Sequence, residues 1–271
     1  MIDWTGPRRQ ECPQCGRGPK DRACGVTIDD RGGVAHCHRC GYVEMRRGES
    51  IAHRPGGPVA PRSEPVRHQV LSEFGRMLWS ACQKIAGEAL AYLEARCCVT
   101  PPADGDLRWH PALHHPPSGL VGPALVALGT DAVTGRSLTL HRTWIRADGR
   151  KAPVTPARML LAGHRKQGAV CRLWPDEAVT TGLAVAEGLE SALSIAHAFQ
   201  PAWCCFDASN LAALPVLDGV DALTVAADND TAGIAAAETC AQRWADSGRQ
   251  ARIVMTPTPG TDINDVAMEA G

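Results

Sequence analysis

The chain has 271 residues, of which 44% are hydrophobic and 21% are charged. This composition is typical of folded domains and excludes a disordered protein, and no run of 18 apolar residues is present to span a membrane. The net charge is −1, but the charges are unevenly distributed along the chain. Residues 181–271 carry 3 Lys and Arg against 12 Asp and Glu, whereas residues 1–180 are basic. Basic surfaces suit phosphate backbones and clustered carboxylates suit divalent cations, so nucleic acid together with metal is the first hypothesis.

Twelve cysteines occur in a chain whose N-terminus lacks the apolar core of a secretion signal. We therefore expect a cytoplasmic protein with reduced thiols rather than a disulfide framework. Four cysteines form two CxxC pairs, Cys12 with Cys15 and Cys37 with Cys40. Two such pairs supply the tetrahedral sulfur cage that Zn²⁺ prefers, so residues 1–45 are predicted to form a zinc ribbon with one structural Zn²⁺.

The segment between the two pairs predicts a hairpin, because apolar and polar residues alternate around a turn that contains Asp30 and Gly32. Cys24 lies in the first strand and is interpreted as a small buried residue rather than a ligand. His36 or His38 could replace a cysteine as ligand, at the cost of breaking one CxxC pair, and this alternative stays open. Four basic residues are expected to surround the ribbon and contact DNA: Lys20, Arg22, Arg31 and Arg39.

Residues 46–67 are rich in proline and glycine, which predicts a flexible linker. Residues 68–180 are predicted to form a basic, mixed α+β subdomain. Apolar residues at helical spacing indicate helices over about 71–85 and 88–97, and the segment 99–119 is expected to be a loop. Strands are predicted at 124–128, 138–145, 159–163 and 168–173.

Basic side chains recur along the strands of this subdomain, and together they are interpreted as a track for phosphates. For any single arginine, a solubilising surface role is the simpler interpretation. The side chains expected to bind nucleic acid or nucleotide are His141, Arg142, Lys151, Arg158 and Lys166.

The last ninety residues alternate strands and helices, which predicts a parallel sheet with right-handed crossovers. Strands are expected at 183–187, 202–208, 222–228 and 252–257, each followed by a helix. The whole chain is therefore predicted to be an α/β protein with an N-terminal zinc ribbon, a mixed middle subdomain and a C-terminal, Rossmann-like subdomain over residues 181–271.

Carboxylates follow three of these strands. Glu187 ends the first strand, Asp228 ends the third with Asp230 two residues later, and Asp262 and Asp265 come just after the fourth. Ligands bind at the carboxyl ends of strands in open α/β sheets, and clustered oxygen ligands favour Mg²⁺ or Mn²⁺. We therefore expect Glu187, Asp228 and Asp230 to hold a catalytic cation. The alternative is that they only cap helices, which for Asp230 alone is equally plausible, and Glu190 is expected to cap or support rather than bind directly.

The segment AVAEGLESALSI resembles the first motif of the toprim fold, and TVAADNDTAGIAAAE resembles its second motif, Asp-x-Asp. With the ribbon CPQCG…CHRCG, the chain resembles bacterial and phage- or plasmid-type DNA primases throughout its length. AYLEARCCV, LRWHPAL, HRTWI..DGRKA and GTDINDV also resemble segments of mobile-element primases. The resemblance implies an enzyme that starts RNA chains on single-stranded DNA from ribonucleoside triphosphates, during replication of a phage or mobile element and beside a separate replicative helicase.

The resemblance also implies roles for particular residues. It places catalytic carboxylates at Glu187, Asp228 and Asp230, a further metal ligand at Asp262, and zinc ligands at Cys12, Cys15, Cys37 and Cys40. The chain departs from the family at Arg96-Cys97, where such proteins often have Arg-Gly. We expect a buried cysteine to be accommodated there only if its backbone keeps a negative φ.

Other proteins with a toprim fold define the alternatives. Topoisomerases need a nucleophilic tyrosine, and the only tyrosines here are Tyr42 in the ribbon and Tyr92 in a predicted helix, so that class is disfavoured. A toprim-type, metal-dependent nuclease and a non-catalytic zinc/toprim clamp on DNA stay open. No GxxxxGK[ST] motif occurs, so no helicase motor is expected within the chain.

Overall fold

A computed structural model of the chain describes residues 2–16, 18, 21–29, 32–47 and 68–270. The chain divides into two compact units, Met1–Arg62 and Ser63–Gly271. Of the linker expected over residues 46–67, the first two residues end strand β4 and the others lie outside the described residues. The division of the second unit at residue 180 stays a prediction.

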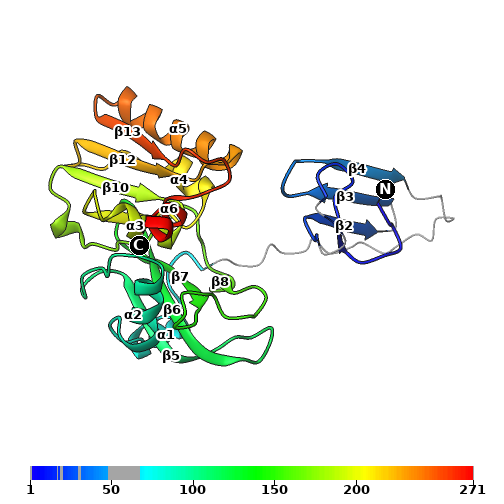
Figure 1. Cartoon of the computed structure of the whole chain (residues 1–271), viewed down its shortest axis with the longest axis horizontal. Coiled ribbons are helices and arrows are strands. Elements are labelled where there is room, and N and C mark those ends of the chain that lie inside the picture. The colour runs from blue at the N-terminus through cyan, green and yellow to red at the C-terminus, as the bar shows by residue number, and fades with distance from the viewer. Residues whose placement is uncertain (1, 17, 19–20, 30–31, 48–67, 271) are drawn as a thin grey trace. The chain divides into compact units, whose positions relative to one another are not determined.

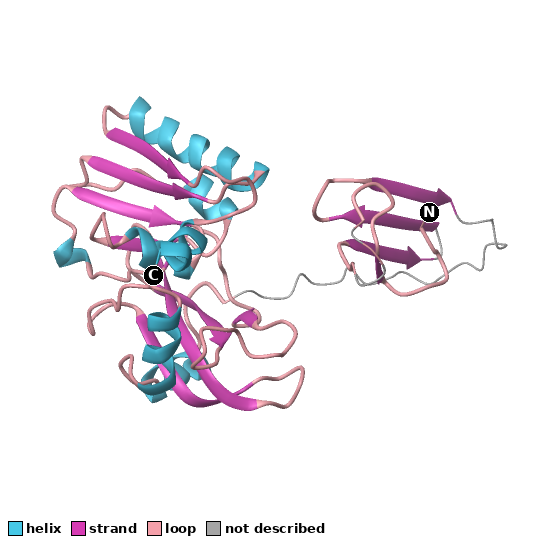
Figure 2. Cartoon of the chain, viewed as in Figure 1, coloured by secondary structure: helices cyan, strands magenta, loops and turns pink. Residues whose placement is uncertain are grey.

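The first unit is an antiparallel sheet in the order β1-β2-β3-β4, and its described residues contain no helix (Figure 2). The predicted hairpin is confirmed, with Cys24 opposite Cys37 in the pairing of β2 and β3. The buried core is small and includes three cysteines, so this unit needs a further source of stability. The strands are β1 (Arg9–Gln10), β2 (Cys24–Asp29), β3 (Gly32–Cys37) and β4 (Val43–Arg47).

The second unit begins with two helices and an antiparallel sheet in the order β5-β6-β7-β8, with β9 paired to β6. Both helices were predicted. Strand β5 replaces part of the expected loop, because Trp109 and Leu113 insert into the core while the backbone pairs with β6. The elements are α1 (Glu73–Ala81), α2 (Gly87–Ala95), β5 (Leu107–His114), β6 (Val121–Asp131), β7 (Ser137–Trp144), β8 (Arg158–Leu160) and β9 (Ala169–Val170).

Helix α2 ends in a left-handed turn at Cys97, whose φ is 51°. The expectation of a negative φ at this cysteine is therefore wrong. The Cys98 N–H donates to Leu93 O at 2.9 Å and the Cys97 N–H donates to Glu94 O at 3.0 Å, which is the Schellman pattern of helix termination. This pattern requires a left-handed residue after the helix, and the turn holds Cys97 in that conformation although glycine suits it better.

The C-terminal part contains the predicted parallel sheet, in the order β11-β10-β12-β13 (Figure 1). A short 3-10 helix, η1 (Asp176–Ala178), precedes it. Each strand leads into a helix, as the alternation of the sequence predicts. The strands are β10 (Gly182–Ala186), β11 (Ala202–Cys204), β12 (Ala222–Ala227) and β13 (Gln250–Met255), and the helices are α3 (Leu189–Ile195), α4 (Ala208–Ala213), α5 (Thr231–Asp246) and α6 (Ile263–Ala270).

Alternate residues of the parallel strands enter two different cores. Ala184 and Ala186 pack with α3 and with Tyr92 of α2, so the antiparallel part of the unit covers this face of the parallel sheet. Leu183 and Val185 point the other way and pack with α4 and α5. This arrangement brings the basic segment against the sheet that carries the strand-end carboxylates. In the part of the chain that the structure describes, no helix combines the length and apolar character needed to cross a bilayer.

Candidate functional site

The four predicted cysteines come together in the first unit. The Sγ atoms of Cys12 and Cys40 lie 3.7 Å apart, as do those of Cys15 and Cys37, and all four lie within 4.8 Å of one another. A tetrahedral zinc ion with bonds of about 2.3 Å separates its sulfur ligands by about 3.8 Å, so the spacing fits Zn²⁺. Cys24 is buried in the adjoining core and does not belong to this group.

Backbone and side-chain groups support this cysteine group. Backbone N–H groups of Cys40 and Arg39 lower the pKa of the Cys37 thiol to about 6. The Arg39 guanidinium donates to both carboxylate oxygens of Asp21 at 2.9 Å and to Cys15 O at 3.2 Å. The arginine expected to contact DNA therefore also holds the two halves of the ribbon together.

Glu187 and Asp228 leave neighbouring strands at the same edge of the parallel sheet. Ala186 of β10 is paired with Ala226 of β12, and each carboxylate follows its strand directly. Burial raises the pKa of Glu187 to about 7, and repulsion by Asp228 and Asp230 adds to the shift. The structure therefore brings these three predicted residues close enough to repel one another.

Asp228 has an oxygen that no protein group satisfies. Its Oδ1 is buried and has no hydrogen-bond partner among the described residues. Burial, followed by repulsion from Asp262 and Asp230, raises its pKa to about 6. An orphaned, buried carboxylate oxygen among other carboxylates is the arrangement that a bound cation would satisfy, so the residues fit a divalent metal ion.

Asp230 and Asp262 both cap helices. Asp230 Oδ1 accepts a hydrogen bond from Gly233 N at 2.8 Å at the start of α5, and Asp262 Oδ1 accepts from Asn264 N at 2.7 Å at the start of α6. Capping is thus confirmed for Asp230. In both Asp230 and Asp262 the cap uses Oδ1, which leaves Oδ2 for another partner.

The carboxylates do not form a closed cage. Within the described part of the chain, only the four cysteines bring three or more ligand atoms of His, Cys, Asp or Glu within 4.8 Å of one another. Mg²⁺ usually keeps several water ligands and binds through one or two carboxylates plus substrate phosphates, so an open site of this kind suits it.

Glu190, in the first turn of α3, is the centre of a buried charged cluster. Tyr92 OH donates to its Oε1 at 2.7 Å, Arg158 Nη2 lies 2.5 Å from Oε2, and Lys151 Nζ lies 3.9 Å from Oε1. Burial alone would raise the pKa of Glu190, but Arg158 and Lys151 lower it to about 2. His141 lies at the edge of this cluster, where burial and Arg158 lower its pKa to about 4.

The other two basic residues predicted to bind nucleic acid or nucleotide, Arg142 and Lys166, lie outside the cluster around Glu190. Arg142 is buried, donates to Leu160 O at 3.0 Å and stacks on Trp144, and it follows His141 on the opposite face of strand β7. Lys166 pairs with Asp207 at 2.9 Å. The structure therefore gathers His141, Lys151 and Arg158 near one another and does not bring Arg142 to them.

Asp207 is a candidate that the sequence analysis missed. It follows strand β11 and caps α4 by accepting from Asn210 N at 2.9 Å, and its charge contributes to the raised pKa of Glu187. The available signal was its place in AWCCFDA, because Asp207 follows parallel strand β11 after two further residues, at the start of the next helix.

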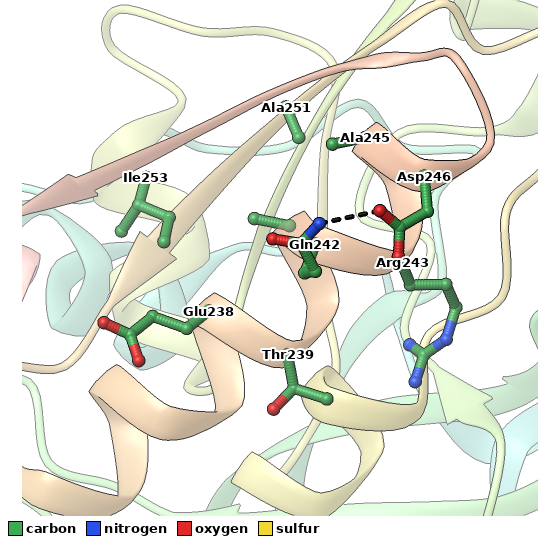
Figure 3. A pocket seen from close by; sticks show the side chains of 9 residues that line it. Glu238, Thr239, Gln242, Arg243, Ala245, Asp246, Ala251 and Ile253 are labelled. Carbon is green, nitrogen blue, oxygen red and sulfur yellow. Dashed lines mark hydrogen bonds between the residues drawn. The ribbon is translucent and has the colours of Figure 1, made fainter.

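A groove of about 980 Å³ runs along the C-terminal half of α5 and strand β13 (Figure 3). Glu238, Gln242 and Asp246 line its helical side, and Gln242 donates to Asp246 within it. None of the strand-end carboxylates lines this groove, so it is separate from the candidate site.

Family comparisons identify the C-terminal part. Residues 182–271 match the Toprim domain family, and residues 70–172 match a domain of unknown function, DUF7146. The C-terminal subdomain is therefore a toprim domain, and the expected combination of a four-cysteine group with a toprim domain is confirmed. No curated protein matches the chain.

Solved structures of primases match the chain at low similarity. A DNA primase domain from Pseudomonas aeruginosa is 14% identical with a TM-score of 0.39, over 59% of this chain and 52% of that chain. The primase fragment of the bacteriophage T7 primase-helicase protein is 16% identical with a TM-score of 0.44, over 97% and 94%. The zinc-binding and RNA polymerase domains of Aquifex aeolicus primase are 15% identical with a TM-score of 0.45, over 68% and 53%. The chain thus spans about half the length of the first and third structures, and similarity at this level assigns no function.

Proposed function

We propose that the protein is a DNA primase that synthesises short RNA primers on single-stranded DNA for replication of a phage or mobile element. One observation carries the proposal: Glu187, Asp228 and Asp230 of a toprim domain lie at one edge of its sheet, next to basic residues of the preceding subdomain. The motifs that resemble mobile-element primases, from the ribbon to GTDINDV, support it. A separate replicative helicase is the partner that this function implies.

In this proposal the carboxylates bind the cation and the basic residues bind the substrates. Glu187, Asp228, Asp230 and Asp262 are the residues that would hold Mg²⁺ or Mn²⁺, which when bound neutralises charge on the triphosphate. Lys151 and Arg158 contact phosphates of the incoming ribonucleoside triphosphate, with His141 beside them. Positioning and charge neutralisation then supply most of the rate enhancement.

The ribbon is proposed to bind the single-stranded template. Its four cysteines hold one Zn²⁺, which replaces a larger hydrophobic core and so fixes the basic surface of the unit. The ribbon is proposed to bind template and not nucleotide. Loss of zinc is therefore expected to abolish initiation on the template and to leave nucleotide binding unchanged.

The test is incubation of the full chain with single-stranded DNA, labelled ribonucleotides and Mg²⁺. New short oligoribonucleotides are the expected product, and they require template, ribonucleotides and divalent cation together. Shortened DNA without new chains would contradict the proposal in favour of a nuclease. DNA binding with neither product would contradict it in favour of a non-catalytic clamp.

A further inference from the structure

Glu190 links two parts of the second unit that are distant in sequence. Its carboxylate belongs to α3 of the toprim domain, whereas Tyr92, Lys151 and Arg158 come from the preceding subdomain. The Glu190 side chain is 4% exposed, which is rare for a charged group without partners. Three partners around one buried carboxylate make this a fixed arrangement rather than a surface ion pair.

The two cations at Glu190 keep donors for another ligand. The side chains of Lys151 and Arg158 are 33% and 41% exposed. Among the described residues, Lys151 Nζ has no hydrogen bond, and Arg158 uses only Nη2 for the bond to Glu190. The cluster lies near the strand-end carboxylates, because Glu190 is in the first turn of α3 and only three residues after Glu187.

The backbone around Lys151 is held independently of Glu190. Lys151 pairs with Ile145 across the turn after β7, and this turn packs on the end of α2. At Gly149, where φ is 76°, a Cβ atom would lie 2.9 Å from that of Ala95, so only glycine lets the turn approach so closely. The turn therefore places the Lys151 backbone, and Glu190 determines where its long side chain points.

We propose that Glu190 is a positioning residue that holds Lys151 and Arg158 at the carboxyl edge of the toprim sheet, where their remaining donors bind the triphosphate of the incoming nucleotide. This inference rests on the proposed function, and it gives Glu190 a role apart from metal binding. Without Glu190, the like charges of Lys151 and Arg158 repel each other and their long side chains become mobile. Triphosphate binding then has to immobilise both side chains, which costs conformational entropy. We expect the affinity for triphosphate to fall about tenfold.

Acetylation of lysine side chains tests this directly, because the chain has only four lysines. Inorganic triphosphate with Mg²⁺ is titrated against the intact protein, and the acetylation rate of each lysine is read by mass spectrometry. Lys151 is expected to be protected in the wild type, and exposed Lys84, in the segment between α1 and α2, serves as the internal reference. Protection of Lys151 needs no primer synthesis, so this test is separate from the test of the proposed function.

Two variants separate position from charge. Glu190→Gln keeps the length of the side chain and removes its charge, whereas Glu190→Asp keeps the charge and shortens the reach. Both are expected to need about tenfold more triphosphate for half-protection of Lys151. Two results would overturn the proposal: tighter triphosphate binding by Glu190→Gln, or protection of Lys151 in Glu190→Asp equal to that in the wild type. Either result would mean that Glu190 only neutralises the charge of Lys151 and Arg158 and does not position them. Absence of protection in the wild type would overturn it as well.

Discussion

Glu187 leaves β10 one residue beyond the Ala186–Ala226 pair, and Asp228 leaves the adjacent β12 two residues beyond it. Strand pairing therefore brings the two carboxylates to one edge, although they are 41 positions apart in the sequence. Burial, followed by repulsion from neighbouring carboxylates, raises the pKa of both groups, so the protein alone disfavours their charged forms at this edge. A divalent cation stabilises the charged forms, which is why the edge serves as a metal site in our account.

Stability is expected to depend on pH through these carboxylates. The folded state raises the pKa of Glu187 from 4.5 to about 7, so the folded protein binds more protons than the unfolded chain within that window. Without metal, the free energy of unfolding should therefore fall as the pH rises from 4.5 to 7. Glu187→Gln should remove part of this fall and be more stable than the wild type at pH 8. The expected difference in the free energy of unfolding is only roughly 1 kcal/mol, because solvent screens the partly exposed group.

Urea unfolding of both proteins at several pH values, with and without Mg²⁺, measures this effect. Mg²⁺ should stabilise the wild type at pH 8 more than the variant, because a ligand that binds only the folded state adds to its stability. Equal pH profiles for the two proteins would contradict the electrostatic description of Glu187.

The sequence predicted the site wherever local pattern decides the structure. Strand–helix alternation was sufficient to place Glu187 and Asp228 at one edge, and CxxC spacing was sufficient to predict the four-cysteine group. Side-chain environment was harder to predict, because it depends on distant partners. His141 and Arg142 are neighbours in β7 and point to opposite faces of the strand. Arg142 contacts Trp144 and Leu160 on its face, so it does not join the other predicted basic residues.

Two further differences have the same origin. Strand β5 was missed because its pairing with β6 overrides local prolines and histidines. The left-handed Cys97 was missed because the hydrogen bonds of the helix end impose the conformation that glycine would adopt freely.

Cys97→Gly should stabilise the protein. The substitution removes the steric cost of a left-handed residue with a Cβ atom, and we expect a gain of about 1 kcal/mol in the free energy of unfolding. Ala91→Gly, within the same helix, is the matched control and should lose about 1 kcal/mol. A loss of stability on Cys97→Gly in chemical denaturation would show that the turn does not strain this residue.

Cys37→Ser should lose zinc and initiation. Atomic absorption is expected to find one zinc ion per wild-type chain and clearly less in the variant, because one of four thiolate ligands is missing. Cys24→Ser is the control, since Cys24 faces Cys37 across the hairpin but is not part of the four-cysteine group. Full zinc content in Cys37→Ser, or its loss in Cys24→Ser, would mean that the ligand set is different.

Binding to single-stranded DNA should weaken steeply with salt. Each phosphate contact contributes a slope of about −0.7 to a plot of log affinity against log salt concentration. Arg22→Gln should make the slope shallower by roughly that amount, because Arg22 is one of the ribbon residues expected to contact DNA. A flat slope for the wild type, measured by fluorescence anisotropy, would remove the argument for a phosphate track.

Primer synthesis by Asp228→Asn tests the central claim most directly. The amide keeps the size of the side chain but removes the charge at the buried, unsatisfied oxygen, and we expect synthesis to fall by about 10² or more while the protein stays folded. Asp246→Asn, an exposed position at the end of α5, is the matched control and should synthesise primers like the wild type. Wild-type synthesis by Asp228→Asn would show that these carboxylates do not form the catalytic metal site.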